Sequence, residues 1–89
     1  MEIPELLAFL DTGGWNCNLW RVWCPFCRRW HVHGAGGKDE DPMKTLGHRV
    51  AHCKPGGPFE ITGYRLVYGG LWQDLPQEVR RRGAPKPRR

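Results

Sequence analysis

The stretch VWCPFCRRWHVHG, residues 22–34, decides the fold that this sequence predicts. It places Cys24 and Cys27 in a Cys-Pro-x-Cys step, followed by two arginines, a tryptophan and two histidines. The flanking segments NLWRVW (18–23) and RRWHVHG (28–34) are rich in aromatic and β-branched residues, which favour strands. We therefore expect a β-hairpin with CPFC as its tight turn, a zinc knuckle that presents both sulfurs toward a common point.

The size of the chain explains why a cross-link is expected. It has 89 residues, of which 12 are glycine and 8 are proline, so much of it is available for turns. A chain this short buries only about 60% of its unfolded surface, and such a domain is often held by a disulfide or a metal. We therefore expect a loop-rich domain that depends on a cross-link.

The N-terminal segment bears on which cross-link is expected. MEIPELLAFLDTGG lacks the basic and long apolar regions of a secretory signal, and its LLAFL run is too short to span a bilayer. We therefore expect a cytoplasmic protein that does not insert into membranes. In that compartment clustered cysteines hold metal more often than disulfides. A disulfide framework remains an alternative if a leader precedes the sequence.

A second group of metal-ligating residues lies downstream, in GHRVAHC. C-x2-C followed some twenty residues later by H-x3-H or H-x4-C is a spacing known from zinc fingers. Thiolates and imidazoles meet around Zn²⁺ in a tetrahedron without redox side reactions. The predicted zinc ligands are Cys24, Cys27, His48 and Cys53, with His52 as the alternate fourth ligand.

Other cysteines and histidines fit the zinc site less well. On an extended strand His31 lies about 13 Å and His33 about 20 Å along from Cys27, which is too far for a shared ion. Cys17 precedes the first strand and is expected to be a small buried residue. Four cysteines could instead carry an iron–sulfur cluster, which stays an alternative.

A redox reading of the cysteine pair is a further alternative. WCPFC is similar to the active-site step of glutaredoxin and related thioredoxin-like proteins. There the first cysteine gains thiolate character at the N-terminus of a long helix. The residues after Cys27 alternate in the manner of a strand and include three glycines, so that helix is not expected.

Outside the hairpin, the sequence predicts the remainder of a small α+β domain. Pro4 at a first helical position, with Leu6, Leu7 and Leu10 on one side, predicts a short helix over 3–11. A polar loop, AGGKDED, follows the hairpin.

Residues 41–53 allow two predictions of secondary structure. DPMKTLGHRVAHC (41–53) begins with a helix-start signal, Asp41 as cap and Pro42 at the first position. A glycine inside it leaves a short helix followed by an extended GHRVAHC as the other possibility. ITGYRLVYGG (61–70) predicts a third strand, and LWQDLPQEVRRR (71–82) predicts a last helical turn or two.

CPFCRRWHVHGAGG, GHRVAHC and TGYRLVY, taken in this order, resemble motifs of a group of small proteins from actinobacteria and their phages and integrative elements. The resemblance covers roughly residues 20–68. It implies a compact zinc-ribbon-like or zinc-finger-like domain, and its matching positions are Cys24, Cys27, His48, His52 and Cys53.

Charge is distributed unevenly along the chain. Residues 1–79 carry eight Lys/Arg and nine Asp/Glu, whereas residues 80–89 carry six Lys/Arg and no acid. The segment RRRGAPKPRR has two prolines and no large apolar residue to anchor it. We therefore expect a single zinc-binding domain over 1–79, with its core at about 15–70, followed by a disordered basic tail.

These features favour a binding module that is not an enzyme. Lys and Arg neutralise phosphates, and exposed aromatic rings stack on unpaired bases, so nucleic acid is the expected partner, as for a phage or mobile-element regulator. An acidic protein partner is the alternative. An HNH-like nuclease using His31 and His33 is less well supported, because no acid adjoins either histidine. The candidate nucleic-acid-binding residues are Arg28, Arg29, Trp30, Arg80, Arg81, Arg82, Lys86, Arg88 and Arg89.

Overall fold

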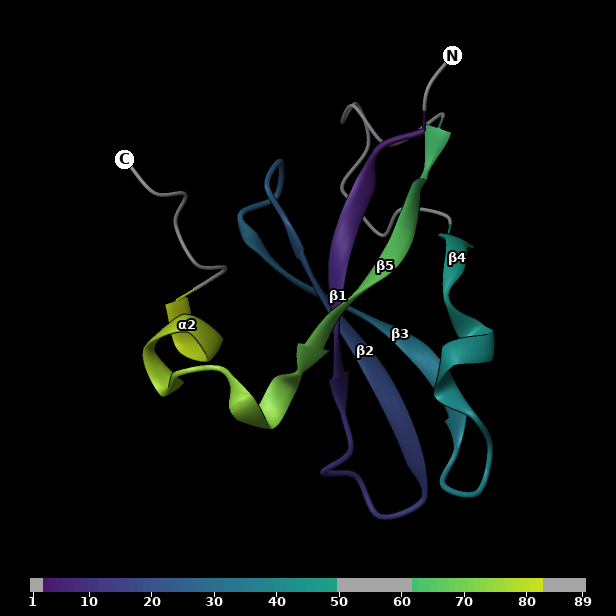
Figure 1. Cartoon of the computed structure of the whole chain (residues 1–89). Helices are drawn as coiled ribbons and strands as arrows, with labels where there is room; N and C mark the ends of the chain where they lie inside the picture. Colours follow the sequence, from purple (N-terminus) through teal and green to yellow (C-terminus); the bar gives the residue numbers. More distant parts are fainter. Residues whose placement is uncertain (1–2, 50–61, 83–89) are drawn as a thin grey trace.

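Five strands form one sheet, in the order β3-β2-β1-β5-β4, in the computed structural model of the protein, which describes residues 3–49 and 62–82 (Figure 1). β1 runs parallel to β5, and the other neighbouring pairs are antiparallel. Short helices complete this small mixed β-sheet domain. The elements are β1 Glu5–Asp11, β2 Cys17–Cys24, β3 Arg29–Gly37, η1 Pro42–Thr45, β4 Gly47–Arg49, β5 Tyr64–Leu71, η2 Trp72–Asp74 and α2 Gln77–Arg82.

The strands predicted over 18–23, 28–34 and 61–70 are confirmed as β2, β3 and β5. Burial alternates along β2 from residue to residue, which is the period-2 pattern of a strand with one face on a core. β2 and β3 pair as a hairpin, with Val22 opposite His31 and Cys24 opposite Arg29.

The helix predicted over 3–11 is wrong, because this segment is β1, a central strand of the sheet. The leucine spacing satisfies a helical period, but an isolated helix of this length is marginal in water. In the sheet the same backbone is hydrogen-bonded on both sides, to β2 and to β5. Residues from Ala8 to Asp11 are all buried, so both faces of the strand are covered at this end.

Of the two readings for 41–53, the described residues follow the one with a short helix and an extended segment. Asp41 caps η1 by accepting a hydrogen bond from the Met43 backbone N–H at 3.1 Å. Pro42 is the first helical residue, as predicted. Gly47 then has φ 127°, which suits glycine, and β4 begins there. Residues 50–53 lie outside the described part.

The helical turns predicted over 71–82 are confirmed as η2 and α2. Since α2 continues to Arg82, the segment expected to be a tail from residue 80 begins inside a helix. Residues 83–89 lie outside the described part. Among the described helices, none has the length and apolar character needed to cross a bilayer.

The sheet is strongly curled, and this curling brings its two edge strands close to each other. β3 and β4 lie at opposite ends of the strand order. Even so, Nη2 of Arg49 in β4 donates to the carbonyl oxygen of Gly34 in β3 at 3.1 Å. The same nitrogen donates to the Thr45 carbonyl at 2.5 Å, which ties η1 to this junction. The curled sheet therefore encloses its inner face.

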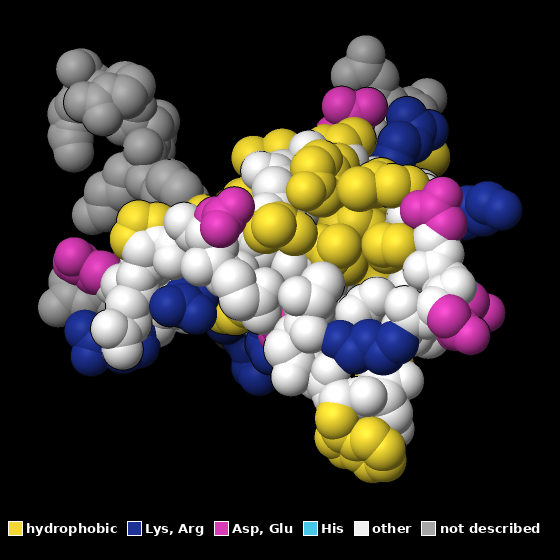
Figure 2. Space-filling model, turned by 60° about the horizontal axis from the view of Figure 1, so that its bottom comes forward, with side chains coloured by type: hydrophobic (Ala, Val, Ile, Leu, Met, Phe, Trp, Pro, Cys, Tyr) yellow, Lys and Arg dark blue, Asp and Glu magenta, His cyan; other side chains and the backbone are white. Residues whose placement is uncertain are grey.

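Apolar side chains also lie on the outside of the domain. Figure 2 shows a continuous hydrophobic area bordered by Lys, Arg, Asp and Glu side chains. Exposed large apolar residues include Met43, Tyr68 and Leu71, and Trp15 in the β1–β2 loop is 88% exposed. Four of the five tryptophans are at least partly buried, so Trp15 stands apart from the rest.

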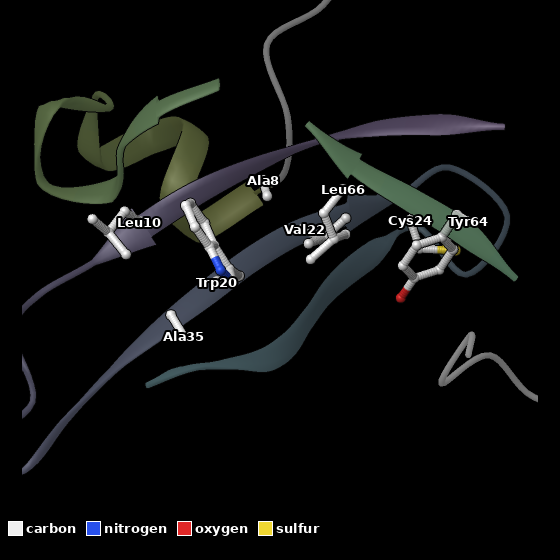
Figure 3. Close-up of a cluster of buried hydrophobic side chains, with 8 residues drawn as sticks. All are labelled: Ala8, Leu10, Trp20, Val22, Cys24, Ala35, Tyr64 and Leu66. Carbon is white, nitrogen blue, oxygen red and sulfur yellow. The ribbon is translucent and has the colours of Figure 1, made fainter. Parts of the chain in front are cut away.

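The inner face holds the main core (Figure 3). Trp20 is fully buried, and its indole Nε1 donates to the Thr45 hydroxyl in η1 at 2.6 Å. Tyr64 lies with Cys24 at the opposite end of this core, and its hydroxyl is 2.8 Å from Nε2 of the buried His33. The core side chains are Ala8, Leu10, Trp20, Val22, Cys24, Ala35, Tyr64 and Leu66.

A second apolar cluster covers the outer face of β1, β2 and β3. The Trp30 ring packs edge-to-face against Phe9, Trp23 and Trp72, with ring centroids 4.9–6.0 Å apart. Such pairs contribute about 0.5–1.5 kcal/mol each beyond the area they bury. η2 thus covers the outer face through Trp72, and the sheet is packed on both sides.

Asp11 links β1, β2 and η2 through its carboxylate. Oδ2 accepts from Arg21 Nε at 2.7 Å, and Oδ1 accepts from the Gly13 backbone N–H at 2.9 Å and from Gln73 Nε2 at 2.8 Å. Burial alone would raise the pKa of Asp11. The three hydrogen bonds and the Arg21 charge outweigh burial and hold the pKa below its ordinary value of 3.8.

We predict that Asp11→Asn lowers stability in a pH-dependent way. Because the folded-state pKa is depressed, the carboxylate contributes stability above its unfolded pKa and loses it as pH falls through the folded pKa. The difference in free energy of unfolding between wild type and Asp11→Asn should therefore shrink as the pH falls through 3.8 and further below it. Urea denaturation at several pH values measures it; a difference that stays constant would contradict the prediction.

Candidate metal site

The turn between β2 and β3 has a backbone arrangement that folds its two cysteines together. The Arg28 backbone N–H donates to the Cys24 carbonyl at 2.7 Å, which closes the turn. The Cys27 backbone N–H donates to Cys24 Sγ at 3.4 Å. Arg28 has φ 58°, a left-handed conformation that a residue other than glycine adopts infrequently. The chain thereby reverses within four residues and enters β3 at Arg29.

Three side chains converge at this turn: Cys24, Cys27 and His31 could hold a metal ion. One ligand atom from each lies within 4.8 Å of the other two. Ligands at about 2.0–2.3 Å from a tetrahedral ion lie roughly 3.5–4 Å from one another, so little adjustment would bring all three onto one ion. Cys24 and His31 are buried and Cys27 is half-buried, so the cluster faces the protein interior. Its donor set, two sulfurs and an imidazole, suits a soft or borderline transition metal.

His31 lies closer to the two cysteines than expected. The expected distance of about 13 Å from Cys27 applies to a straight extended strand. In the hairpin His31 pairs with Val22 and Arg29 pairs with Cys24, so His31 is the diagonal neighbour of Cys24 on the inner face. Diagonal neighbours lie about 7–8 Å apart at their backbones, within reach of a histidine and a cysteine side chain.

His48 is placed apart from this group. It lies in β4, is exposed, and its Nε2 donates to the Thr62 carbonyl at 2.6 Å. Within residues 3–49 and 62–82, the group of three ligand atoms that forms at the turn does not include His48. His52 and Cys53, the other two downstream ligand candidates, lie outside the described residues.

Cys17 and His33 also lie away from the cluster. Cys17 begins β2 and Cys24 ends it, a separation of roughly 23 Å along an extended strand. His33 pairs with Trp20 and contacts Tyr64 through its ring, with centroids 5.6 Å apart. Both His31 and His33 are less than 10% exposed, so neither is presented to a phosphate in solvent as the nuclease alternative requires.

The hairpin also weakens the redox alternative. Cys24 ends a strand and Cys27 lies in the turn that follows, with β3 beginning two residues later. A depressed thiol pKa of the thioredoxin kind depends on a helix that begins at the first cysteine. In the described chain the cysteine pair lies between two strands instead.

The structure divides the candidate nucleic-acid-binding residues. Arg28 and Arg29 are exposed at the hairpin end. Trp30 is half-buried in the outer aromatic cluster, so it packs and does not offer a free ring face for stacking. Arg80 and Arg81 line a shallow cavity of about 230 Å³ beside Trp72 and Gln77. Of the others, Arg82 ends α2, and Lys86, Arg88 and Arg89 lie outside the described residues.

Comparison with known proteins gives no match to a protein-family model, to a curated protein or to a solved structure.

We predict that His31→Ala weakens metal binding, whereas His48→Ala does so less. Losing a direct ligand should cost at least the roughly 10- to 100-fold that loss of an outer-shell partner costs. Competition with a chromogenic chelator, using Zn²⁺ or the spectroscopic probe Co²⁺, measures the affinity of each variant. Equal losses, or a larger loss for His48→Ala, would return His48 to the ligand set in place of His31.

Proposed function

We propose that the chain is a zinc-stabilised binding module whose partner is nucleic acid. The observation that carries the zinc assignment is the convergence of two sulfurs and one imidazole nitrogen at the hairpin turn. Zn²⁺ takes this donor set in tetrahedral structural sites, and it brings no redox chemistry into a reducing compartment. Backbone N–H groups that donate to ligand sulfurs, as Cys27 donates to Cys24, support a bound thiolate.

The small core gives a physical reason for such an ion. Among the described residues, the inner core consists of eight buried side chains, of which two are alanine. A structural zinc supplies folding free energy of about 10–16 kcal/mol in zinc-finger peptides. That is as large as the whole stability of an ordinary domain, about 5–15 kcal/mol. An ion at Cys24, Cys27 and His31 would fix the β2–β3 hairpin, on which the rest of the sheet assembles.

Three protein ligands leave one position of a structural tetrahedron to fill. The sequence offers Cys53, which lies in the GHRVAHC motif that the resemblance includes. We infer that Cys53 is the fourth ligand, with His52 as its alternate, and that the chain belongs with the actinobacterial and phage proteins sharing these motifs. With His31 in the set, the site becomes Cys24, Cys27, His31 and Cys53.

Nucleic-acid binding is supported by the cations. The body of the chain is close to neutral, and the C-terminal ten residues carry six positive charges and no negative one. Arg80 and Arg81 continue this charge onto the folded surface, beside an aromatic ring. Arg28 and Arg29 add exposed charge at the hairpin end. Phosphate neutralisation by such groups gives affinity with little dependence on base sequence.

The hydrophobic area on the surface favours a second candidate, a protein-interaction module. Figure 2 shows acidic and basic side chains bordering this area, and Met43, Tyr68 and Leu71 are among the large apolar residues of the domain that are more than a third exposed. Contiguous exposed apolar area on a small domain often marks a protein-binding site. A protein partner would bind here without using the basic C-terminal segment.

We predict one zinc ion per chain and loss of structure on its removal. Native mass spectrometry should show the mass of one Zn²⁺, and chelation should abolish the dispersed amide NMR spectrum because the small core alone does not offset chain entropy. Cys53→Ser should lose the ion, whereas Cys17→Ser, the matched cysteine control, should keep it. A metal-free chain with an unchanged spectrum would contradict the zinc assignment.

We also predict that the full chain binds labelled DNA or RNA with a steep salt dependence. Each phosphate contact contributes a slope of about −0.7 to −0.9 in a plot of log affinity against log salt concentration. Deleting residues 83–89 removes three cations and should lower the slope by about 2–3. Fluorescence anisotropy measures both quantities. Absence of binding even at low salt would favour the protein-partner candidate.

A further inference from the structure

We propose that the bound nucleic acid is single-stranded and lies on one surface built from the β1–β2 loop, η2 and α2. In this proposal Trp15 stacks on an unpaired base, and Arg80 and Arg81 bind phosphates beside Trp72. The inference rests on the proposed nucleic-acid function and names its site and substrate class. We call this surface the strand face, and it consists of Trp15, Lys38, Trp72, Gln77, Arg80 and Arg81.

Trp15 is the first observation that supports the strand face. Its side chain is 88% exposed, although a tryptophan can bury about 150–250 Å² and Trp23, Trp30 and Trp72 are packed together on the outer face of the sheet. The loop that carries it is tight, since a Cβ added at Gly14 would lie 2.9 Å from the Cys17 carbonyl oxygen. Trp15 is therefore held on a short, constrained loop with its ring in solvent.

One cation lies at the base of this loop, directly before the acidic residues Asp39, Glu40 and Asp41. Lys38 Nζ donates to the Thr12 carbonyl at 2.6 Å, which brings an ammonium group to the loop. An exposed aromatic ring beside a cation is the combination that binds unpaired bases and their phosphates. A duplex keeps its bases stacked on each other, so its bases cannot stack on the Trp15 ring. The described α-helix has six residues, which is short for a helix that reads the major groove.

The cavity beside Trp72 is the second observation. It has a volume of about 230 Å³, and its lining residues are Trp72, Gln77, Arg80 and Arg81, none of them acidic. The cavity is shallow and open to solvent, so a phosphate group can reach its lining residues. The Nε atom of Arg80 is buried without a hydrogen-bond partner among the described atoms. Because this Nε is buried, a phosphate would contact other atoms of the Arg80 guanidinium.

Asp11 links the loop that carries Trp15 to the elements that form the cavity beside Trp72. Its Oδ1 accepts from the Gly13 backbone in the Trp15 loop and from Gln73 in η2. Its Oδ2 accepts from Arg21, whose guanidinium lies 4.8 Å from the Trp72 ring centroid. The Trp15 loop and the cavity beside Trp72 are thus both linked to Asp11 before any ligand binds. Preorganisation of this kind lowers the ordering cost of binding.

The test compares two sets of full-length variants by anisotropy with a labelled twelve-residue oligothymidylate and with a twelve-base-pair duplex. Trp15→Ala should weaken binding to the single strand about 5- to 100-fold, the range for loss of one stacked base. Leu7→Ala, at another exposed large apolar side chain, is its control and should change affinity less than twofold. Trp15→Phe should recover most of the affinity, because it restores a stacking ring.

The arginine cavity is tested with a matched pair of charges. Arg80→Gln/Arg81→Gln should weaken single-strand binding at least tenfold. Lys44→Gln/Arg65→Gln removes two cations elsewhere and should weaken it no more than about threefold. Metal content and NMR dispersion of each variant confirm that it is folded. A shift of the Trp15 indole N–H signal on addition of the oligothymidylate gives a readout that needs no substitution.

Each outcome has a distinct meaning. Equal losses for the two double variants, or no effect of Trp15→Ala on a chain that binds DNA, would overturn the strand face and leave the proposed function intact. Tighter binding of the duplex than of the single strand would also overturn it. If the wild-type chain binds neither probe at low salt, the proposed nucleic-acid function fails as well.

Discussion

The reversal of the chain between Cys24 and Arg29 is the constraint on which the rest of the domain depends. It sets the register of the β2–β3 hairpin, with His31 opposite Val22 and His33 opposite Trp20. One face of both strands then points inward, so the same reversal places three side chains that could hold a metal ion at the turn and a Trp–His pair deeper in the core. A one-residue slip would exchange the two faces and move every one of these side chains to the wrong side. The left-handed Arg28 and the N–H···S bond from Cys27 hold the turn in place.

The curled sheet is stabilised on two faces by different chemistry. On the inner face, β5 contributes Tyr64 and Leu66 to a core that is closed by bonds between opposite edges, such as that from Arg49 to Gly34. On the outer face, three tryptophans and Phe9 pack edge-to-face beneath η2. Asp11 lies where β1 meets both layers and hydrogen-bonds to the loop, to β2 and to η2. A chain of 89 residues with one sheet thereby covers both faces of its central strand, because the curled sheet encloses the inner face and η2 packs on the outer face.

Local chemistry made several elements predictable from the sequence. β-Branched and aromatic alternation identified β2, β3 and β5, and the Asp41-Pro42 pair identified the start of η1, because each signal acts within a few residues. β1 was mispredicted for a physical reason. ELLAFLD satisfies a helical spacing of leucines, but its conformation is decided by β2 and β5, whose backbones lie on either side of it. A strand that pairs on both edges with distant segments carries little of that information in its own residues.

The candidate metal site was likewise predictable only in part from the sequence. Cys24 and Cys27 were identified from their spacing, because a two-residue separation in a turn brings the sulfurs together whatever surrounds them. His31 was missed, because a distance counted along an extended strand ignores the diagonal contact that a hairpin creates. The signal was present: a histidine four residues after the second cysteine of a tight turn lies on the same hairpin face as the first. The sequence by itself therefore determined the hairpin, its turn and the basic C-terminal segment, since these follow from neighbouring residues. Only the tertiary structure decided which imidazole joins the sulfurs, which tryptophan faces solvent and that the first apolar segment is a strand, because each depends on contacts between residues far apart in the chain.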